Sequence, residues 1–388
     1  MRLAVFHDHQ RLRQGGAALA RLAVALLDEG LHLLRLVPDD FDPYRSDIHE
    51  RSIALVSRAS YAAHVPWWLR GARRERLLDL LERDAPDAVY ACGGRTWSLA
   101  AECAAALECP LVLEVGTSEE IERLRERGAA RSAAGVVLLR TDPGEDATAA
   151  ESPLAAATAR AAGGVEVAIV RPGVAAHRDG GDGPLAAGPE RHPAGVAIAL
   201  VGGCTSLERW RPVIDALRGL DEHAPHWQAV VELRGPAEHA VWRMLRDAGF
   251  LPRVATVSDA EALGPLLWRC EVMAVVEPQR GASTPILEAM AARMPLAASA
   301  DPWLPLVDGR TGLVVRPGGT RGALTDAWRQ AFETLCVDRP RAIALGAAAA
   351  THVATHHQTS RQAASLMGLL RRVAGGETMP FPAAAARR

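Results

Sequence analysis

The apolar positions of the chain form short continuous runs that alternate with longer segments of helical spacing. Runs this short and uninterrupted are typical of strands buried on both faces of a parallel sheet. They lie at 3–6, 31–37, 88–91, 111–115, 135–139, 165–170, 196–201, 229–233, 272–276, 296–299 and 313–315. Helical spacing occurs at 16–29, 73–83, 207–217, 237–248, 285–293 and 324–335. This alternation predicts the α/β fold class with doubly wound parallel sheets.

The alternation stops once, near the middle of the chain. Residues 173–195 are rich in Gly, Pro and charge and show no periodicity, which indicates a linker between two domains. The expected N-terminal domain spans 1–172 and the expected C-terminal domain spans 196–340. Helices are expected at 341–373, followed by a disordered tail at 374–388. Ligands of such domains bind at the carboxyl ends of the strands, which predicts a site at a cleft between the domains.

The absence of two residue types, Lys and Asn, limits the reactions and modifications that the chain can support. All 44 residues counted as Lys plus Arg are Arg, and the 388 residues include neither Lys nor Asn. Lysine-dependent classes such as P-loop enzymes and Schiff-base enzymes are therefore excluded, as is N-glycosylation. An anion site in this chain must use Arg, backbone amides or helix N-termini.

Charge, cysteines and hydropathy set the class of protein. The net charge of −2 argues against a dedicated nucleic-acid-binding protein, so no nucleic-acid partner is expected. The six cysteines are scattered without a CxxC pair or a zinc-site spacing, which fits a reducing cytoplasm. The sequence has no recognisable signal peptide and no apolar run long enough to cross a membrane. We therefore expect a cytoplasmic protein.

One continuous segment carries a specific motif. Residues 270–317 read CEVMAVVEPQRGASTPILEAMAARMPLAASADPWLPLVDGRTGLVVRP, with a Leu-Glu-Ala-Met-Ala helix and an Asp-Gly-x-Thr-Gly turn. The segment resembles the donor-binding core of retaining family-4 glycosyltransferases of the GT-B fold, and looser similarity extends over residues 1–373. The resemblance implies two tandem Rossmann-like domains facing a cleft, and a C-terminal helical stretch that crosses back to the first domain. It also implies transfer of a sugar from a nucleotide-sugar with retention, without a required metal or other cofactor.

The motif predicts where the donor binds. Ser283 and Thr284 precede Pro285, which makes a good helix N-terminus whose amides and dipole attract a diphosphate. The resemblance implies that Glu288 binds the ribose hydroxyls. Other expected donor-binding positions are glycines that allow the backbone to approach the phosphates: Gly15, Gly16, Gly202, Gly203 and Gly281.

The chain departs from the family at several polar positions. Arg280 stands where the first of two acidic residues is expected, and Gly203 and Glu208 replace a phosphate-binding Arg and a Lys. The positions of the family's N-terminal histidines are occupied by Tyr90, Cys92 and Gly116. This number of changes suggests an altered or lost reaction.

Two arginines offer a replacement for the lost positive charges. Arg209 lies one residue beyond the family's Lys position and Arg280 lies beside the helix N-terminus, so both are candidates for stabilising the leaving diphosphate. In the alternative interpretation they are solvated surface residues. His7 and Asp8 follow the first strand and are candidates for acting on an acceptor hydroxyl, as is His9.

Two further features have a functional and a structural interpretation. Trp67 and Trp68 beside Arg73 and Arg74 fit a weak peripheral membrane contact, or a pair of rings packed beneath the following helix. The i, i+4 pair His352/His356 lacks the glutamate of a zinc motif and a third ligand, so packing is expected and no metal site is predicted.

Two hypotheses follow from the sequence. The first is a glycosyltransferase that moves a sugar from a nucleotide-sugar to an acceptor, which is a glycan, a lipid-linked sugar or a small molecule. The second is a GT-B protein with a degenerate site that binds a nucleotide, a glycan or a partner protein without transfer.

Overall fold

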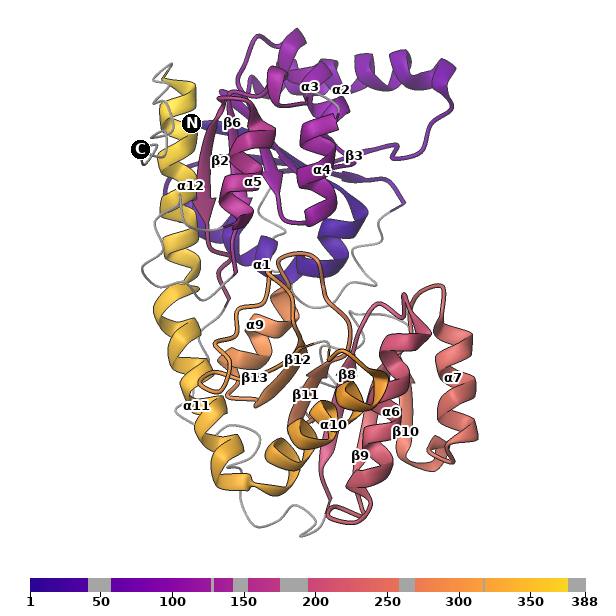
Figure 1. Ribbon diagram of the computed structural model, residues 1–388. Helices are drawn as coiled ribbons and strands as arrows, with labels where there is room; N and C mark the ends of the chain where they lie inside the picture. The colour runs from indigo at the N-terminus through magenta and orange to yellow at the C-terminus, as the bar shows by residue number, and fades with distance from the viewer. Residues whose placement is uncertain are drawn as a thin grey trace, which may run out of the picture. The chain divides into compact units, whose positions relative to one another are not determined.

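The computed structural model describes residues 1–40, 57–126, 129–141, 153–174, 195–257, 269–316 and 318–375 (Figure 1). The chain divides into two compact units. Unit 1 consists of Met1–Gly173 and Gln358–Arg388, and unit 2 of Val174–His357. The linker expected at 173–195 and the tail expected at 374–388 lie almost entirely outside the described residues.

Unit 1 contains a seven-stranded sheet in the order β3-β2-β1-β4-β5-β6-β7, in which every pair is parallel. Its strands are β1 (Arg2–His7), β2 (His32–Pro38), β3 (Ser57–Tyr61), β4 (Ala88–Cys92), β5 (Leu111–Val115), β6 (Gly135–Leu139) and β7 (Glu166–Val170). Its helices are α1 (His9–Asp28), η2 (Trp67–Leu69), α2 (Arg70–Asp84), α3 (Trp97–Ala106), α4 (Ser118–Glu126), η3 (Ala129–Ser132), α5 (Pro153–Ala162) and α12 (Thr359–Ala374).

The last helix that the structure describes belongs to unit 1. α12 packs against α1 and β7 and buries an apolar face that includes Leu366, Leu369 and Leu370. Two polar contacts add to this packing: the guanidinium group of Arg372 donates to Glu166 at 2.7 Å, and the side-chain oxygen of Gln362 accepts the backbone amide of Gly173 at 2.8 Å. α12 therefore completes the fold of unit 1 although it lies far from it in sequence.

Unit 2 contains a six-stranded parallel sheet in the order β10-β9-β8-β11-β12-β13. Its strands are β8 (Ala197–Val201), β9 (Gln228–Glu232), β10 (Val254–Val257), β11 (Val272–Val275), β12 (Leu296–Ser299) and β13 (Leu313–Val315). Its helices are α6 (Leu207–Leu220), α7 (Glu238–Asp247), η4 (Leu251–Arg253), α9 (Thr284–Ala291), α10 (Arg321–Phe332), η5 (Glu333–Val337) and α11 (Arg339–His356).

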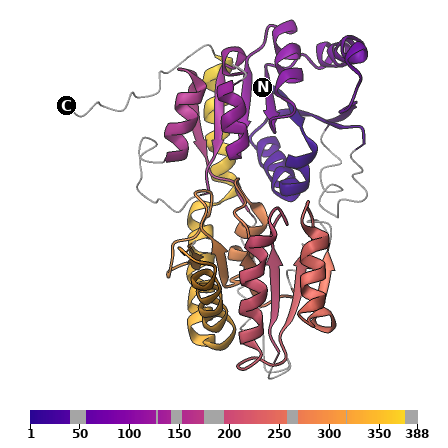
Figure 2. The same ribbon diagram turned by 45° about the vertical axis from the view of Figure 1, so that its right-hand side comes forward.

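Helices cover both faces of the unit 2 sheet, and Figure 2 shows the strands and helices in a turned view. Along β8, Leu200 faces a core that contains Trp210 of α6, whereas Val201 faces a second core that contains Ile286 of α9. Burying one large aliphatic side chain stabilises a fold by about 1.5–3 kcal/mol, so continuous apolar strands are favoured when both faces are covered. The predicted α/β fold class with two doubly wound parallel sheets is confirmed.

Within the described ranges, no helix combines the length and the apolar character needed to cross a membrane. All six cysteines carry free thiols.

Candidate functional site

The strand order of each sheet reverses beside its first strand. In unit 1, β1 stands between β2 and β4, and in unit 2, β8 stands between β9 and β11. The loops that leave the two strands at such a switch point run in opposite directions, which opens a crevice at the carboxyl ends of the strands. The switch points β1/β4 and β8/β11 are therefore the candidate sites.

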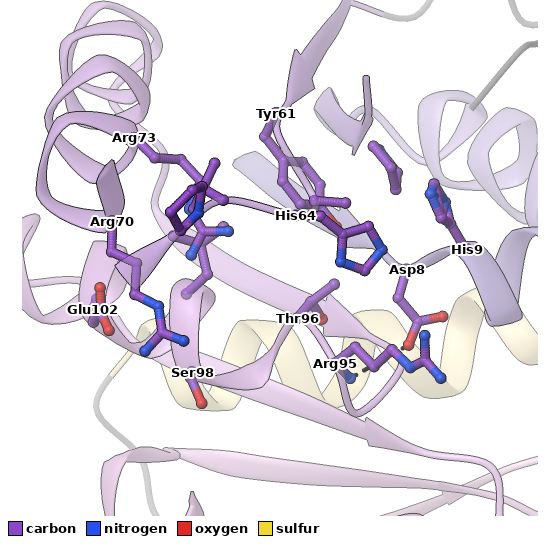
Figure 3. Close-up of a pocket in the computed structure, with 15 residues that line it drawn as sticks. Asp8, His9, Tyr61, His64, Arg70, Arg73, Arg95, Thr96, Ser98 and Glu102 are labelled. Carbon is purple, nitrogen blue, oxygen red and sulfur yellow. Dashed lines mark hydrogen bonds between the residues drawn. The ribbon is translucent and has the colours of Figure 1, made fainter. Parts of the chain in front are cut away.

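A pocket of about 580 Å³ lies at the unit 1 switch point (Figure 3). It is formed at the carboxyl ends of the neighbouring strands β3, β2, β1 and β4, by the segment before α2 and by the starts of α2 and α3. Its volume suits a small molecule. The charged, hydroxyl and imidazole side chains in its lining are Asp8, His9, Tyr61, His64, Arg70, Arg73, Arg95, Thr96, Ser98 and Glu102.

Asp8 joins the two loops of this switch point. Its carboxylate accepts the backbone amide of Arg11 at 2.7 Å, which caps α1, and the backbone amide of Arg95 at 3.3 Å. Gly93, at φ +98°, lies directly against the carboxylate, and a Cβ there would come within 2.2 Å of Oδ2. Asp8 is buried, and this burial raises the pKa of its carboxyl group. The predicted site residue Asp8 therefore forms part of the pocket wall and holds the loop after β4.

The second predicted residue of this loop, His7, lies outside the pocket lining. It is buried in β1, where Arg35 Nε donates to its Nε2 at 3.5 Å, and its Nδ1 has no hydrogen-bond partner among the described residues. Burial, together with the charges of Arg35 and Arg11, holds the pKa of His7 well below its ordinary value, so the imidazole is neutral. His9 does line the pocket, and its Nε2 lies 2.6 Å from a carboxylate oxygen of Asp40.

The glycines Gly15 and Gly16 lie inside a helix rather than at the end of a loop. The sequence predicts a helix from residue 16, but α1 begins at His9 because Asp8 caps it there. Gly15 adopts φ −153° and ψ 23°, which kinks α1 at this point. A Cβ at Gly16 would contact nothing within 4 Å.

Two carboxylates of unit 1 that no motif indicated lie outside the pocket lining. Glu114 of β5 is buried, pairs with Arg11 Nε at 2.6 Å and accepts the hydroxyl of Tyr90 at 2.7 Å. Glu120 accepts the backbone amide of Gly116 at 2.7 Å, and burial raises the pKa of its carboxyl group to about 7. Tyr90 and Gly116 occupy expected histidine positions, so in this chain those positions bind carboxylates.

In unit 2, α9 begins at the carboxyl edge of the sheet. Ser283 is its N-cap residue and forms no side-chain cap hydrogen bond, and Pro285 lies in the first turn. The positive end of the helix therefore has no capping side chain. Gly281 and Thr284 are buried at this end, and Glu288 is half-buried one turn further along.

Glu277 engages the loop after β8 and was not indicated by any motif. Its carboxylate, on a side chain that is 2% exposed, accepts the amide of Thr205 at 2.9 Å, the Thr205 hydroxyl at 2.8 Å and the amide of Ser206 at 3.1 Å. The indole Nε1 of Trp210 donates to it at 3.1 Å. Backbone amides before α6 that would be available to an anionic ligand are therefore engaged by a carboxylate of the protein.

The glycines of the same loop are tightly surrounded. The amide of Gly202 donates to Glu232 at 3.1 Å, and a Cβ on Gly202 would lie 3.2 Å from the ring of Trp210. A Cβ on Gly203 would lie 3.6 Å from Glu277 Oε2. The predicted donor glycines Gly202 and Gly203 are thus beside two carboxylates.

Comparison with solved structures shows which known fold the chain has. No family model and no curated protein matches the sequence. The structure is similar to that of HepE from Anabaena in complex with UDP and glucose, with a TM-score of 0.70 and 14% identity, over 96% of this chain and 99% of HepE. The chain has the GT-B fold.

Two further GT-B structures match over nearly their whole length. The sucrose-phosphate synthase of Thermosynechococcus elongatus matches with a TM-score of 0.67 and 15% identity, over 97% of this chain and 100% of that chain. The lipopolysaccharide outer core galactosyltransferase WaaB matches with a TM-score of 0.60 and 12% identity, over 96% of this chain and 99% of that chain. At the level of the fold, the resemblance to GT-B glycosyltransferases is confirmed.

The two candidate arginines of unit 2, Arg209 and Arg280, are exposed. Arg209 lies in the first turn of α6, and neither it nor Arg280 forms an ion pair within the part of the chain that the structure describes. Arg280 has φ +54°, and its backbone amide donates to Asp301 at 2.7 Å. The role of both side chains at a diphosphate stays a prediction.

The tryptophan pair of η2 lies on the surface of unit 1. The side chains of Trp67 and Trp68 are 75% and 66% exposed, and their rings meet edge to face with centroids 5.8 Å apart. The interpretation in which the pair packs beneath α2 is therefore wrong, because η2 has no buried residue. Large exposed aromatic side chains beside arginines are typical of contact surfaces.

The histidines of α11 lie in a packed part of unit 2. His352 is 7% exposed, and its ring centroid lies 4.7 Å from that of His356 and 5.8 Å from that of His357. No group of three or more His, Cys, Asp or Glu side chains among the described residues is arranged so that it could hold a metal ion.

Proposed function

We propose that this GT-B protein is a glycosyltransferase that moves a sugar from a nucleotide-sugar donor to an acceptor with retention of configuration. The observation that carries the proposal is the start of α9 at the carboxyl edge of the unit 2 sheet, where the N-cap Ser283 forms no side-chain cap hydrogen bond. The similarity to HepE, which has been crystallised in complex with UDP-glucose, supports a nucleotide-sugar as the ligand.

The proposed donor site uses the residues around α9. The amides near Gly281, Ser283 and Thr284 bind the diphosphate, and Glu288 binds the ribose hydroxyls. Arg209 and Arg280 stabilise the charge that develops on the leaving diphosphate, so that catalysis rests on positioning and electrostatic stabilisation and needs no metal. Gly202 and Gly203, in the loop after β8, form part of this donor site.

The proposed acceptor side is unit 1. Asp8 lies in the wall of its pocket, where its carboxylate is within reach of a bound hydroxyl group. His7 is buried directly before Asp8 in the chain, and α1 is kinked at Gly15. The acceptor is a glycan, a lipid-linked sugar or a small molecule.

The hydrogen bonds of Glu277 favour a second function, in which the protein binds a ligand without transferring a sugar. A diphosphate carries about two negative charges, and a buried carboxylate already uses the amides of the β8–α6 loop. Like charges at close range oppose binding more strongly inside a protein than in water. In this alternative, unit 2 binds a nucleotide weakly or not at all, and the protein acts through another ligand or a partner.

Isothermal titration of the full chain with UDP, GDP and ADP tests the two functions. A transferase binds one of the three nucleotides and loses affinity about tenfold in Arg280→Gln, as expected for one charge-assisted hydrogen bond, whereas Arg211→Gln on the exposed face of α6 leaves the affinity unchanged. Absence of binding of all three nucleotides to the parent contradicts the transferase and favours the second function.

The exposed surface of η2 supports a weak peripheral membrane contact near Trp67, Trp68, Arg73 and Arg74. Tryptophans partition into the interface of a bilayer, and arginines bind anionic headgroups. Co-sedimentation with anionic vesicles checks this contact. The parent should be retained and the double variant Trp67→Ala/Trp68→Ala should be released, whereas equal sedimentation of the two proteins contradicts the contact.

A further inference from the structure

We infer that the pocket of unit 1 binds a small molecule that carries a phosphate group, held by Arg70, Arg73 and Arg95. The inference concerns unit 1 alone and holds whether or not unit 2 binds a nucleotide. If the proposed transfer takes place, this ligand is the acceptor, and the inference then names its chemical class.

The three arginines bring three positive charges to the pocket and form no ion pair with the described residues that line it. Arg70 and Arg73 reach the pocket from the start of α2, and Arg95 enters from the loop after β4, beside Asp8 (Figure 3). None of the three forms an ion pair with a carboxylate in the described ranges. In contrast, two other arginines of unit 1 form ion pairs, Arg372 with Glu166 and Arg11 with Glu114. Guanidinium groups stay charged at any physiological pH, so the pocket keeps its positive potential.

Arg73 is held in place before any ligand binds. Its Nη1 donates to the backbone carbonyl of Ala62 at 3.1 Å, and its Nε is buried without a hydrogen-bond partner in the described part of unit 1. A fixed guanidinium group loses little side-chain entropy when an anion binds to its free edge. Arg73 therefore offers a preorganised contact. Arg70 and Arg95 are exposed, and their side chains move to contact the ligand when it binds.

The two carboxylates of the lining leave the arginine charges unbalanced. Asp8 is 5% exposed and its oxygens accept the backbone amides of Arg11 and Arg95. Glu102 is exposed on α3. Three guanidinium groups thus face two carboxylates, one of which is buried and engaged by amides.

The start of α3 adds donors on the same side of the pocket. Thr96 is the N-cap residue of this ten-residue helix and forms no side-chain cap hydrogen bond, because its hydroxyl donates to the carbonyl of Gly93 at 2.7 Å. Ser98, in the first turn, lines the pocket and is exposed. A helix start with its dipole favours an anion, and bidentate arginines match the oxygens of a phosphate.

The pocket volume limits the size of the rest of the ligand. A space of about 580 Å³ accommodates a molecule as large as a hexose phosphate, and the imidazoles of His9 and His64 together with the Ser98 hydroxyl provide partners for its hydroxyl groups. The phosphate has two sources that this chemistry does not separate: a soluble sugar phosphate, or the headgroup of an anionic lipid reached beside Trp67 and Trp68.

Titration of the full chain with glucose 6-phosphate, glucose 1-phosphate and glucose tests the inference for the soluble source. We expect a phosphate ester to bind at least tenfold more tightly than glucose, with an affinity that falls as the salt concentration rises. Arg70→Gln and Arg95→Gln should each weaken binding about tenfold or more, and the exposed Arg76→Gln on α2 should leave it unchanged. Thermal unfolding of each variant establishes that it is folded.

Vesicles of phosphatidylcholine with and without phosphatidic acid test the lipid source. Retention that requires phosphatidic acid and is lost in Arg70→Gln and Arg95→Gln supports the inference, and additional loss in Trp67→Ala/Trp68→Ala assigns the phosphate to a headgroup. The inference is overturned if neither phosphate esters nor phosphatidic acid bind, or if the arginine variants bind as the parent does. Binding of UDP to the Arg70→Gln variant with parental affinity separates this outcome from a failure of the donor site.

Discussion

The carboxylate of Glu277 accepts hydrogen bonds from both the amide and the hydroxyl of Thr205, at 2.9 and 2.8 Å. This contact joins the end of β11 to the loop after β8, and Trp210 and Ser206 donate to the same carboxylate. A buried acceptor with four donors cannot be replaced without leaving some of them unsatisfied. Glu277 therefore holds the switch point of unit 2 together, whatever ligand binds nearby.

Glu277→Gln should destabilise the protein by about 2–4 kcal/mol, because the new amide NH₂ group meets donors and leaves them unpaired. The free energy of unfolding from urea denaturation measures this loss. Glu208→Gln, at an exposed position of α6, is the matched control and should change the stability by less than about 0.5 kcal/mol. Equal stability of the two variants would mean that the carboxylate does not organise the loop.

The contact between Gly93 and Asp8 yields a second prediction. Gly93→Ala should destabilise unit 1 by about 3 kcal/mol or more, because the new Cβ would lie 2.2 Å from the carboxylate of Asp8. Gly164→Ala is a matched control, since Gly164 has the same φ of +98° with nothing within 4 Å, and it should lose only about 1–2 kcal/mol from backbone strain. Chemical denaturation compares the two variants. A difference close to zero contradicts the tight packing of this switch point.

The sequence predicted the inner strands of both sheets and missed one edge strand in each. β3 (SRASY) and β10 (VATV) are the outermost strands on one side of their sheets, and the side chains of Ala255 and Thr256 in β10 are exposed. Neither strand carries a continuous apolar run, so the hydrophobic pattern does not reveal it, whereas the opposite edge strands β7 and β13 lie in such runs and were predicted. The inner strands are covered on both faces, so they consist of continuous apolar runs that the sequence shows clearly.

The candidate site was less predictable than the fold. The motif around Ser283 and Glu288 was visible because its residues are contiguous. Glu277 could not be predicted as a site residue, because its role comes from a hydrogen bond with Thr205, 72 positions earlier in the chain. Likewise, Arg70 and Arg95 gain significance only because strands β3, β2, β1 and β4 bring them to one pocket.

The buried ion pair between Arg11 and Glu114 yields a third prediction. Arg11→Met leaves Glu114 charged and buried without its partner, and it should destabilise the protein by about 3–5 kcal/mol. The double variant Arg11→Met/Glu114→Met should recover most of this loss, because both charges are then absent. Urea denaturation of the parent, both single variants and the double variant measures the coupling. Additive losses in the double variant would show that the two charges do not interact.

Glu120 should make the stability of unit 1 depend on pH. Burial raises the pKa of its carboxyl group from 4.5 to about 7, so between these values the folded protein holds a proton that the unfolded chain has released. Stability from this group is therefore fully present below about pH 4.5, and it falls as the pH rises towards 7, by an amount on the order of 3 kcal/mol.

Comparison with Glu120→Gln isolates this effect, because glutamine does not titrate. The free energy of unfolding of the parent minus that of the variant should decrease from pH 4.5 to pH 7 and stay constant above that range. Glu119→Gln, on the exposed side of α4, is the control and should leave the pH profile of the parent unchanged. A difference between parent and Glu120→Gln that does not vary with pH contradicts the raised pKa. In that case the amides of Gly94 and Gly116, which donate to the Glu120 carboxylate at 2.7 Å, offset the effect of its burial.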